Sequence, residues 1–158
     1  MDTTATILVM LVLLTFSAYF SATETAFNTA SQTKLKIEAD KGNGNAALAL
    51  RLLDSYDKLL STILVSNNIV NIALTAIATV FFVNYIGDSG ATVSTAVMTV
   101  VVLFFGEITP KSLAKEYPET FTKFSAPILH GIMLLLTPVN WIFSAWKKFI
   151  SKLITGED

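Results

Sequence analysis

The pattern of hydrophobic and polar positions divides the chain into long apolar runs separated by short polar ones. Apolar runs occupy residues 5–27, 59–83 and 91–106. A hydrocarbon core of about 30 Å is crossed by roughly 20 apolar residues in a helix. The first two runs reach that length, and the third is shorter because it stops at Gly106-Glu107. The pattern predicts an all-α integral membrane fold with three transmembrane helices per subunit.

A polar segment at residues 31–58 separates the first two spans. Its turn signal, KGNGN at 41–45, lies between two short helical patterns whose apolar faces include Ile37 and Leu52. We interpret the segment as a helical hairpin next to the membrane, and a solvated loop is the alternative.

The distribution of Lys and Arg predicts the orientation in the membrane. Five of the 11 basic residues lie in 31–58, and none lies in 84–90. Short cytoplasmic loops collect basic residues. We therefore expect a multi-pass protein of the plasma membrane with its N-terminus outside and its hairpin in the cytosol.

A fourth apolar stretch, 124–143, contains two prolines and a glycine. If it crossed the membrane, Lys147, Lys148 and Lys152 would lie outside, against the positive-inside pattern. We therefore predict interfacial or re-entrant helices over 119–154, with a cytosolic C-terminus. A fourth crossing is the alternative.

Composition excludes several function classes. Hydrophobic residues make up 53% of the chain and charged residues 15%, and the net charge is −1, so the chain offers no electrostatic basis for binding nucleic acid. The chain has no Cys, and His130 is its only histidine. Zinc–thiolate sites and histidine triads are thereby excluded, and no enzyme is expected.

Polar residues within apolar spans are costly and are often functional. At about 1.5 Å per residue, three polar clusters fall in one layer between the midplane and the cytosolic face. The clusters are Ser17, Ser21, Thr23, Glu24 and Thr25, then Ser66, Asn67, Asn68 and Asn71, then the run from Gly106 to Lys111. Hydrogen bonding across helices is the alternative for Ser17, Asn68 and Asn71.

The third cluster predicts a cation site. Pro110 cannot continue a helix, so we expect the third helix to break within the membrane and leave carbonyls unpaired near Glu107. A carboxylate at the negative end of a helix needs a cation or a proton. Hydroxyls and amides of the other spans would complete an oxygen shell suited to Mg²⁺, Ca²⁺ or Na⁺. The alternatives for Glu107 are a carboxylate that snorkels to the membrane surface or one that is protonated. We expect Lys111 to contact lipid headgroups. We expect Glu24 to form a salt bridge or hydrogen bond with the hairpin.

Three ordered motifs resemble a known family. FSATETAF (20–27), ILVSNNIVNI (63–72) and FFGEITPKSLA (104–114) are similar to the transmembrane domain of the CorC/CNNM (cyclin M) magnesium transport proteins. The usual family motifs are S-G-S-E-T-A and G-N-N. Ala22 replaces the glycine of the first motif, Thr23 its second serine, and Ser66 the glycine of the second motif.

The resemblance implies a homodimer that carries out Na⁺-linked Mg²⁺ efflux, with Mg²⁺ as the bound ion and Na⁺ as the coupled one. A Mg²⁺-binding sensor or scaffold that regulates another transporter, and a structural dimerisation module, are the alternatives. The resemblance also implies a cytosolic CBS-pair module that binds ATP–Mg²⁺, which we expect outside these residues. The ion ligands carried over by motif are Ser21, Ser66, Asn67, the Gly106 carbonyl and Glu107, with Ser17, Asn68 and Asn71 as second-tier candidates.

Overall fold

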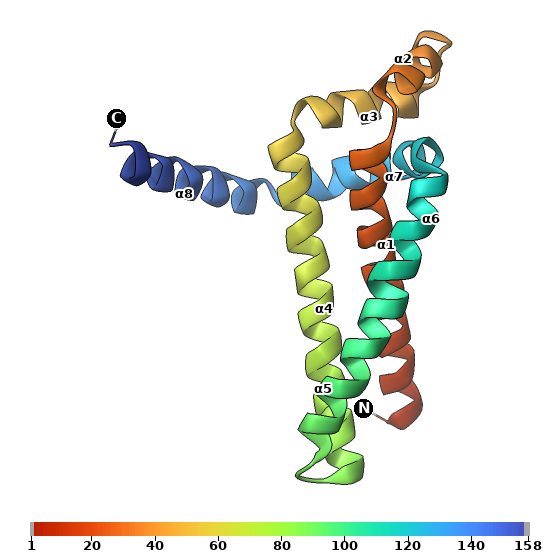
Figure 1. Ribbon diagram of the computed structural model, residues 1–158, viewed down its shortest axis with the longest axis vertical. Helices are drawn as coiled ribbons and strands as arrows, with labels where there is room; N and C mark the ends of the chain where they lie inside the picture. The colour runs from red at the N-terminus through yellow and green to blue at the C-terminus, as the bar shows by residue number, and fades with distance from the viewer. Residues whose placement is uncertain (1, 157–158) are drawn as a thin grey trace.

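Three long helices form a central bundle in the computed structural model, which describes residues 2–156 (Figure 1). Each is long and apolar enough to cross a membrane, which confirms the predicted all-α membrane fold with three spans. The third is one continuous helix with a change of helical type in its middle. The bounds are α1 (Thr3–Thr29), α4 (Tyr56–Ile86) and, along the third helix, α5 (Gly90–Val101), the π-helical η1 (Val102–Ile108) and α6 (Thr109–Glu116).

The bundle carries large apolar side chains on its outside and small or polar ones between its helices. Ile72 and Val100 are 68% and 62% exposed, whereas Ser17 and Ala78 are fully buried. Lipid tails are as apolar as these side chains, so burying them against another helix gives no hydrophobic gain in a bilayer. Close approach through small residues and interhelical hydrogen bonds therefore holds the spans together.

The third helix does not end at Pro110, contrary to the prediction. Pro110 lies in the first turn of α6, directly after η1, and its missing N–H removes one hydrogen bond from the continuous helix. The preceding η1 segment is π-helical, and the N–H of Thr109 bonds to the carbonyl of Phe104, five residues earlier. This wider turn immediately precedes the proline, and the helical backbone continues past the ring to Glu116.

The segment between the first two spans forms the predicted hairpin, which consists of α2 (Gln32–Asp40) and α3 (Gly44–Asp54). Gly42 makes the turn with a φ of +99°, a conformation that favours glycine. Leu52 is buried, as predicted for the apolar face of the hairpin. Ile37 is 50% exposed, so its predicted place on that face is wrong. The apolar face of α2 buries Leu35 instead, two residues earlier in the helix.

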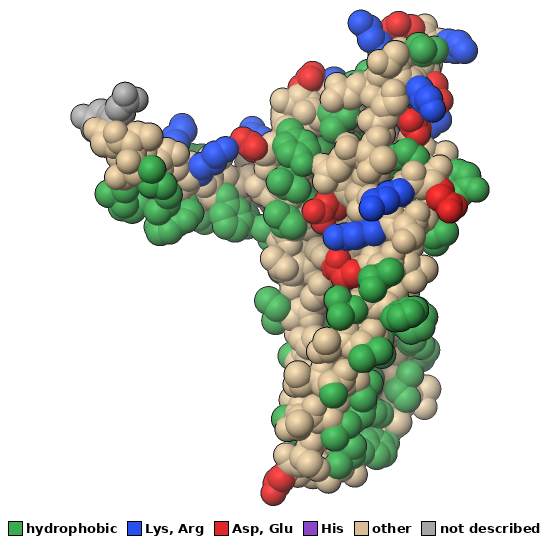
Figure 2. Space-filling model, in the orientation of Figure 1, with side chains coloured by type: hydrophobic (Ala, Val, Ile, Leu, Met, Phe, Trp, Pro, Cys, Tyr) green, Lys and Arg blue, Asp and Glu red, His purple; other side chains and the backbone are tan. Residues whose placement is uncertain are grey.

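The C-terminal part is an elbow of two helices, α7 (Pro118–Leu135) and α8 (Thr137–Thr155), bent by 74°. Helix α7 lies across the hairpin end of the bundle, and α8 projects to the side (Figure 1). Hydrophobic side chains cover the side of α8 that faces along the bundle, and Lys side chains lie on its hairpin side (Figure 2). The stretch 124–143 is therefore divided between two helices, an arrangement that fits the predicted interfacial or re-entrant helices.

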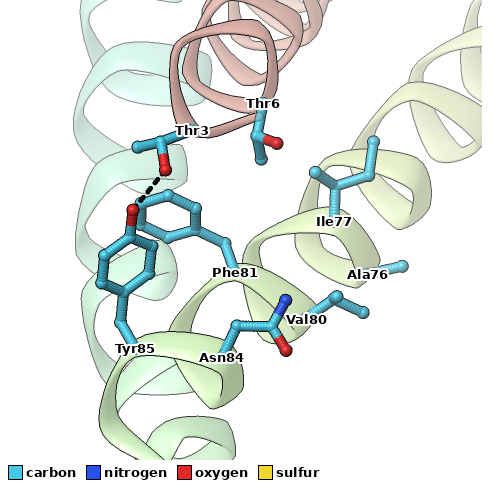
Figure 3. A pocket seen from close by; sticks show the side chains of 8 residues that line it. All are labelled: Thr3, Thr6, Ala76, Ile77, Val80, Phe81, Asn84 and Tyr85. Atoms are coloured by element: carbon cyan, nitrogen blue, oxygen red, sulfur yellow. Dashed lines mark hydrogen bonds between the residues drawn. The ribbon is translucent and has the colours of Figure 1, made fainter. Parts of the chain in front are cut away.

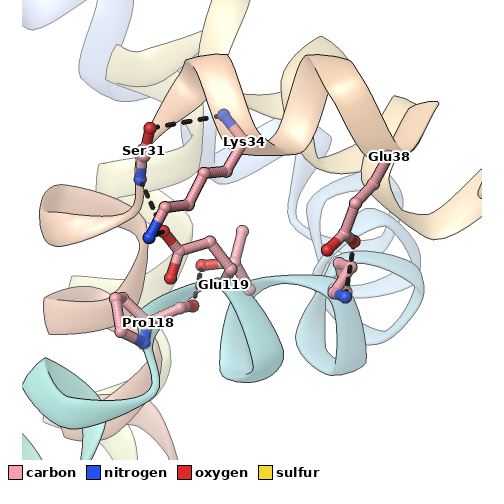
Figure 4. Close-up of polar contacts among 7 residues, drawn as sticks. Ser31, Lys34, Glu38, Pro118 and Glu119 are labelled. Atoms are coloured by element: carbon pink, nitrogen blue, oxygen red, sulfur yellow. Dashed lines mark hydrogen bonds and ion pairs between the residues drawn. The ribbon is translucent and has the colours of Figure 1, made fainter. Parts of the chain in front are cut away.

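Ion pairs connect the hairpin to α7 (Figure 4). Lys123 of α7 pairs with Glu38 of α2. Glu119, in the first turn of α7, accepts a hydrogen bond from the N–H of Ser31 at 3.3 Å and lies 3.9 Å from the Lys34 ammonium. These contacts fix the hairpin over the end of the bundle at which the polar layer lies.

Candidate ion-binding site

Polar side chains of α1, α4 and η1 meet at one level of the bundle. At about 1.5 Å per residue, Ser21, Asn67 and Glu107 lie about 25–29 Å from the ends of their helices at the α4–α5 turn. The predicted polar layer is therefore a place where three helices contact one another. Two hydrogen-bonded groups form this layer, one around Ser21 and one around Ser17.

The first group joins α1 to the third helix through Glu107. The Ser21 hydroxyl is fully buried and donates a hydrogen bond to Glu107 Oε1 at 3.2 Å. The other carboxylate oxygen, Oε2, lies 3.2 Å from the Lys111 ammonium. The side chains of Glu107 and Lys111 are 28% and 39% exposed. The carboxylate is therefore partly buried, and its negative charge is balanced by a cation of the same helix.

Lys111, which the sequence analysis expects at lipid headgroups, forms an ion pair with Glu107 in the structure. The sequence did carry a signal for the ion pair, because residues four apart on a helix are neighbours and Glu precedes Lys in the favourable order. The expected helix break at Pro110 concealed this spacing. The structure retains the helix, so the two side chains lie on one face.

The second group joins α1 to α4 through Ser17. The Ser17 hydroxyl lies 2.6 Å from Asn71 Oδ1 and 3.5 Å from Asn67 Oδ1. One hydroxyl has a single proton, so the shorter contact to Asn71 is the principal hydrogen bond. Ser17 is fully buried and Asn67 is 8% exposed. Ser17, a second-tier residue by sequence, is therefore at the centre of the polar layer.

Gly106 allows η1 to approach α1 at this point. It is buried, and a Cβ atom added to it would lie 3.0 Å from the Ser17 hydroxyl oxygen. Gly106 therefore provides space next to Ser17, in addition to the carbonyl that the motif resemblance suggested. The next residue is Glu107, so this close approach also brings the carboxylate to Ser21.

The remaining predicted residues are less closely connected to these groups. Ser66 is buried next to Asn67, but no hydrogen bond joins its hydroxyl to the polar layer among residues 2–156. Asn68 is exposed on another face of α4 and is not brought into the layer. Glu24 is partly buried on the α1 face of Ser17 and Ser21, and within the described residues it forms no ion pair or side-chain hydrogen bond with the hairpin.

The chemistry of the layer is one carboxylate surrounded by neutral oxygens. No group of three or more His, Asp or Glu side chains gathers in the part of the chain that the structure describes. Hydroxyl and amide oxygens with one carboxylate are ligands for hard cations such as Mg²⁺ and Na⁺. Pro110 has no N–H, so a backbone carbonyl of the preceding turn lacks the helical donor that another residue would supply. The proline thus leaves backbone oxygen near Glu107 without ending the helix.

A cavity at the opposite end of the bundle has a different character. It has a volume of about 590 Å³ and lies between the start of α1 and the end of α4 (Figure 3). Thr3 and Tyr85 are hydrogen-bonded at its edge. No charged side chain is among its lining residues, which are Thr3, Thr6, Ala76, Ile77, Val80, Phe81, Asn84 and Tyr85. It therefore offers no counter-charge for an ion.

Comparison with known proteins gives consistent matches over this chain. The profile of the family described as "Cyclin M transmembrane N-terminal domain" matches residues 8–158. A UPF0053 protein of Haemophilus influenzae is 35% identical over 147 residues, which cover 93% of this chain and 35% of the relative. The UPF0053 inner membrane protein YfjD of Escherichia coli is 36% identical over 138 residues, 87% of this chain and 32% of the relative.

A plant protein is also similar. A chloroplastic DUF21 domain-containing protein of Arabidopsis thaliana is 33% identical over 147 residues, 93% of this chain and 22% of the relative. The chain therefore spans about a third or less of the length of these curated relatives.

Proposed function

The chain belongs to the family of the cyclin M transmembrane N-terminal domain, and from that premise we propose that it carries Mg²⁺ across the membrane through the Glu107 site. The observation that supports this most directly is the contact of Glu107 with Ser21 across two membrane helices. It places one carboxylate beside buried hydroxyl and amide oxygens, at a level where charge is otherwise avoided.

The charge of the site suits transport. One carboxylate leaves a bound divalent ion with a local charge of +1, so binding is moderate. Conduction requires an ion to leave as well as to bind. Ser21, Ser17 and Asn67 supply neutral oxygens that replace part of the hydration shell of the ion.

Before a metal ion binds, the positive charge of Lys111 balances the Glu107 carboxylate. Its ammonium lies on Glu107 Oε2, so an arriving Mg²⁺ competes with it for the carboxylate. Lys111 is 39% exposed and has a long flexible side chain, so it can swing away when the ion binds and return when it leaves. This exchange avoids an unpaired carboxylate inside the membrane at any stage.

The transport that we propose is Na⁺-coupled efflux. Na⁺ uses the same oxygen ligands as Mg²⁺ and carries half its charge, so one carboxylate neutralises it fully. We further propose a homodimer in the plasma membrane, with the N-terminus outside and the hairpin and C-terminus in the cytosol. The Lys and Arg residues of the hairpin and of α8 support this orientation.

A Mg²⁺ sensor is the second candidate function. The ion pairs between α2 and α7 support it, because they connect the hairpin to the helix that follows the site-bearing span. An ion that altered η1 would then move a cytosolic surface. Ion binding without flux would favour this function over transport.

The test of the transport proposal is Mg²⁺ flux in proteoliposomes. Glu107→Gln keeps the size of the side chain and removes its charge, so we expect flux to be abolished while the protein still folds. Ser21→Ala and Asn67→Ala should weaken transport less, because each removes a neutral ligand that water can replace. Lys111→Gln should tighten Mg²⁺ binding, since it removes the competing cation. Near-normal flux in Glu107→Gln would show that the ion site is elsewhere.

Glu24→Gln is the matched control. It makes the same substitution in a partly buried carboxylate of α1 that forms no bond to Glu107 in the described structure. We expect it to retain flux, and thermal unfolding with and without Mg²⁺ should show stabilisation by the ion in Glu24→Gln but not in Glu107→Gln. Equal loss in both variants would mean that the site depends on general negative charge.

A further inference from the structure

A second cavity lies at the hairpin end of the bundle, where α3, the start of α4, α7 and α8 come together. Its volume is about 500 Å³. It lies on the side of the bundle from which α8 projects, away from the Glu107 contacts. Its lining residues are Leu48, Arg51, Leu52, Ser55, Lys58, His130, Met133, Leu134, Thr137, Asn140, Trp141 and Ser144.

This cavity combines fixed positive charge with an apolar wall. Arg51 and Lys58 contribute two cations from α3 and α4, and His130 adds an imidazole from α7. No Asp or Glu is among the residues that line it. The nearest neighbour of Lys58 in sequence, Asp57, is paired with Lys147 of α8 at 2.9 Å. The cationic groups of the cavity are therefore available to an anion.

A buried amide faces the same cavity without a complete set of partners. Asn140 is 5% exposed, and its amide nitrogen donates a hydrogen bond to the Thr62 hydroxyl at 3.2 Å. Its side-chain oxygen is buried and has no hydrogen-bond partner among residues 2–156. A buried acceptor without a donor costs free energy. A ligand that brings a hydroxyl or amine beside its anionic group would satisfy it.

The apolar wall faces the part of the molecule that lies in lipid. Trp141 and Leu134 are 71% and 65% exposed, although both line the cavity. Helix α8 leaves the bundle here, with its hydrophobic side facing along the spans (Figure 2). Tryptophan is typical of the headgroup level of a membrane. A ligand in this cavity therefore has its charged end at the headgroups and an apolar continuation along the helices.

We propose that this cavity binds one anionic phospholipid. Its phosphate lies between Arg51 and Lys58, a headgroup hydroxyl donates to Asn140, and its acyl chains follow Met133 and Trp141. Basic pockets between membrane helices on the cytoplasmic side are suited to such headgroups. A free phosphate ion would contact only the cationic groups, and no part of it would cover the exposed apolar wall.

The experiment uses Trp141 as a reporter in the full chain. The chain has two Trp residues, so Trp146→Phe leaves Trp141 as the only one. The protein is placed in vesicles that mix phosphatidylglycerol with phosphatidylcholine, with bromine on the acyl chains of one lipid or the other. Quenching then measures the preference of the cavity for the anionic lipid. We expect a preference of about 30-fold, given two basic residues near the surface.

Arg51→Gln/Lys58→Gln in this background should reduce the preference to near equality. Lys36→Gln/Lys41→Gln removes the same charge from exposed positions of the hairpin outside the cavity, and should retain the preference. Asn140→Leu removes the hydrogen-bond acceptor. It should lower the preference for anionic lipids whose headgroup carries a hydroxyl. The five substituted positions other than Asn140 are all exposed. Circular dichroism therefore checks folding chiefly for Asn140→Leu.

Three results would overturn the proposal. Equal quenching by both brominated lipids in the Trp146→Phe protein would show that no anionic site exists. An equal loss in the Lys36→Gln/Lys41→Gln control would assign the preference to diffuse surface charge. Displacement of the brominated lipid by millimolar inorganic phosphate would show that the cavity takes soluble anions.

Discussion

At the scale of single residues, one contact decides how closely the third helix approaches the first. Gly106 lies against the Ser17 hydroxyl, and the same hydroxyl bonds to Asn71 of α4. Ser17 therefore contacts both other spans at once. A side chain at 106 would separate η1 from α1 and, with it, Glu107 from Ser21.

We expect Gly106→Ala to lower the thermal stability of the purified protein. Its Cβ would lie 3.0 Å from the Ser17 oxygen. Overpacking of this kind costs about 1–3 kcal/mol, opposed by about 1 kcal/mol of helix propensity that Ala gains over Gly. In a Ser17→Ala background the same change meets no hydroxyl, and should be neutral or stabilising. The four melting temperatures form a cycle, and an equal effect of Gly106→Ala in both backgrounds would contradict the contact.

At the scale of elements, the third helix and the hairpin depend on neighbours that lie far away in sequence. The third helix accommodates Pro110 by a π turn, and that turn packs against α1. The hairpin is held over the bundle by pairs such as Glu38–Lys123. Both features connect the polar layer to the helices at the hairpin end of the bundle.

Reversing one charge of the Glu38–Lys123 pair should weaken the attachment of the hairpin. Glu38→Lys places two cations together, and we expect a loss of about 0.2–1 kcal/mol, as for other partly exposed pairs. Glu38→Lys/Lys123→Glu should recover most of it. Thermal unfolding at low and high salt measures the loss in the single variant and the recovery in the double variant, since salt screens the pair.

Asp40→Lys is the control for this exchange. Asp40 is exposed on the same helix and forms no ion pair among residues 2–156. A loss in Asp40→Lys equal to that in Glu38→Lys would indicate a general effect of net charge, and failure of the double exchange to recover stability would contradict a direct pair.

At the scale of the whole molecule, three apolar spans carry a charged platform at one end. Basic and acidic side chains gather over the hairpin end, and the lower part of the visible face carries hydrophobic side chains, with acidic atoms at its tip (Figure 2). Such asymmetry is the basis of the proposed orientation, in which the hairpin end faces the cytosol. The Glu107 layer lies closer to this charged platform than to the α4–α5 turn.

The orientation can be measured by labelling, because the chain has no Cys of its own. Ser89, in the α4–α5 turn, and Ser151, on α8, are both exposed. We expect Ser89→Cys to react with an impermeant reagent from outside and Ser151→Cys only after the membrane is opened. External labelling at both positions would contradict the three-span orientation and favour a fourth crossing by 124–143.

The proposed dimer should appear in a mass measurement in nanodiscs as two copies of the chain. Small residues of the second span suit close packing between helices. Ala76 is exposed on α4 and available for it, whereas Ala78 is fully buried within the subunit. A strict monomer that still transports Mg²⁺ would contradict the dimer.

Much of the architecture follows from the sequence because it depends on local hydrophobicity. The three spans, the hairpin and the polar layer were all predicted from apolar run lengths, turn residues and helical rise. These properties hold for any helix in a bilayer, where backbone groups must bond internally. Ser21, Asn67 and Glu107 were placed at one depth for the same reason.

The tertiary structure decided which polar residues meet and how the third helix passes Pro110. The sequence predicted a break there because proline lacks an N–H, but the preceding turn is π-helical, packs against α1 and continues into α6. Continuation of that helix placed the Lys111 ammonium on Glu107. Ser17 became central and Asn68 peripheral because rotation about a helix axis, unlike depth, is determined by the neighbouring helices.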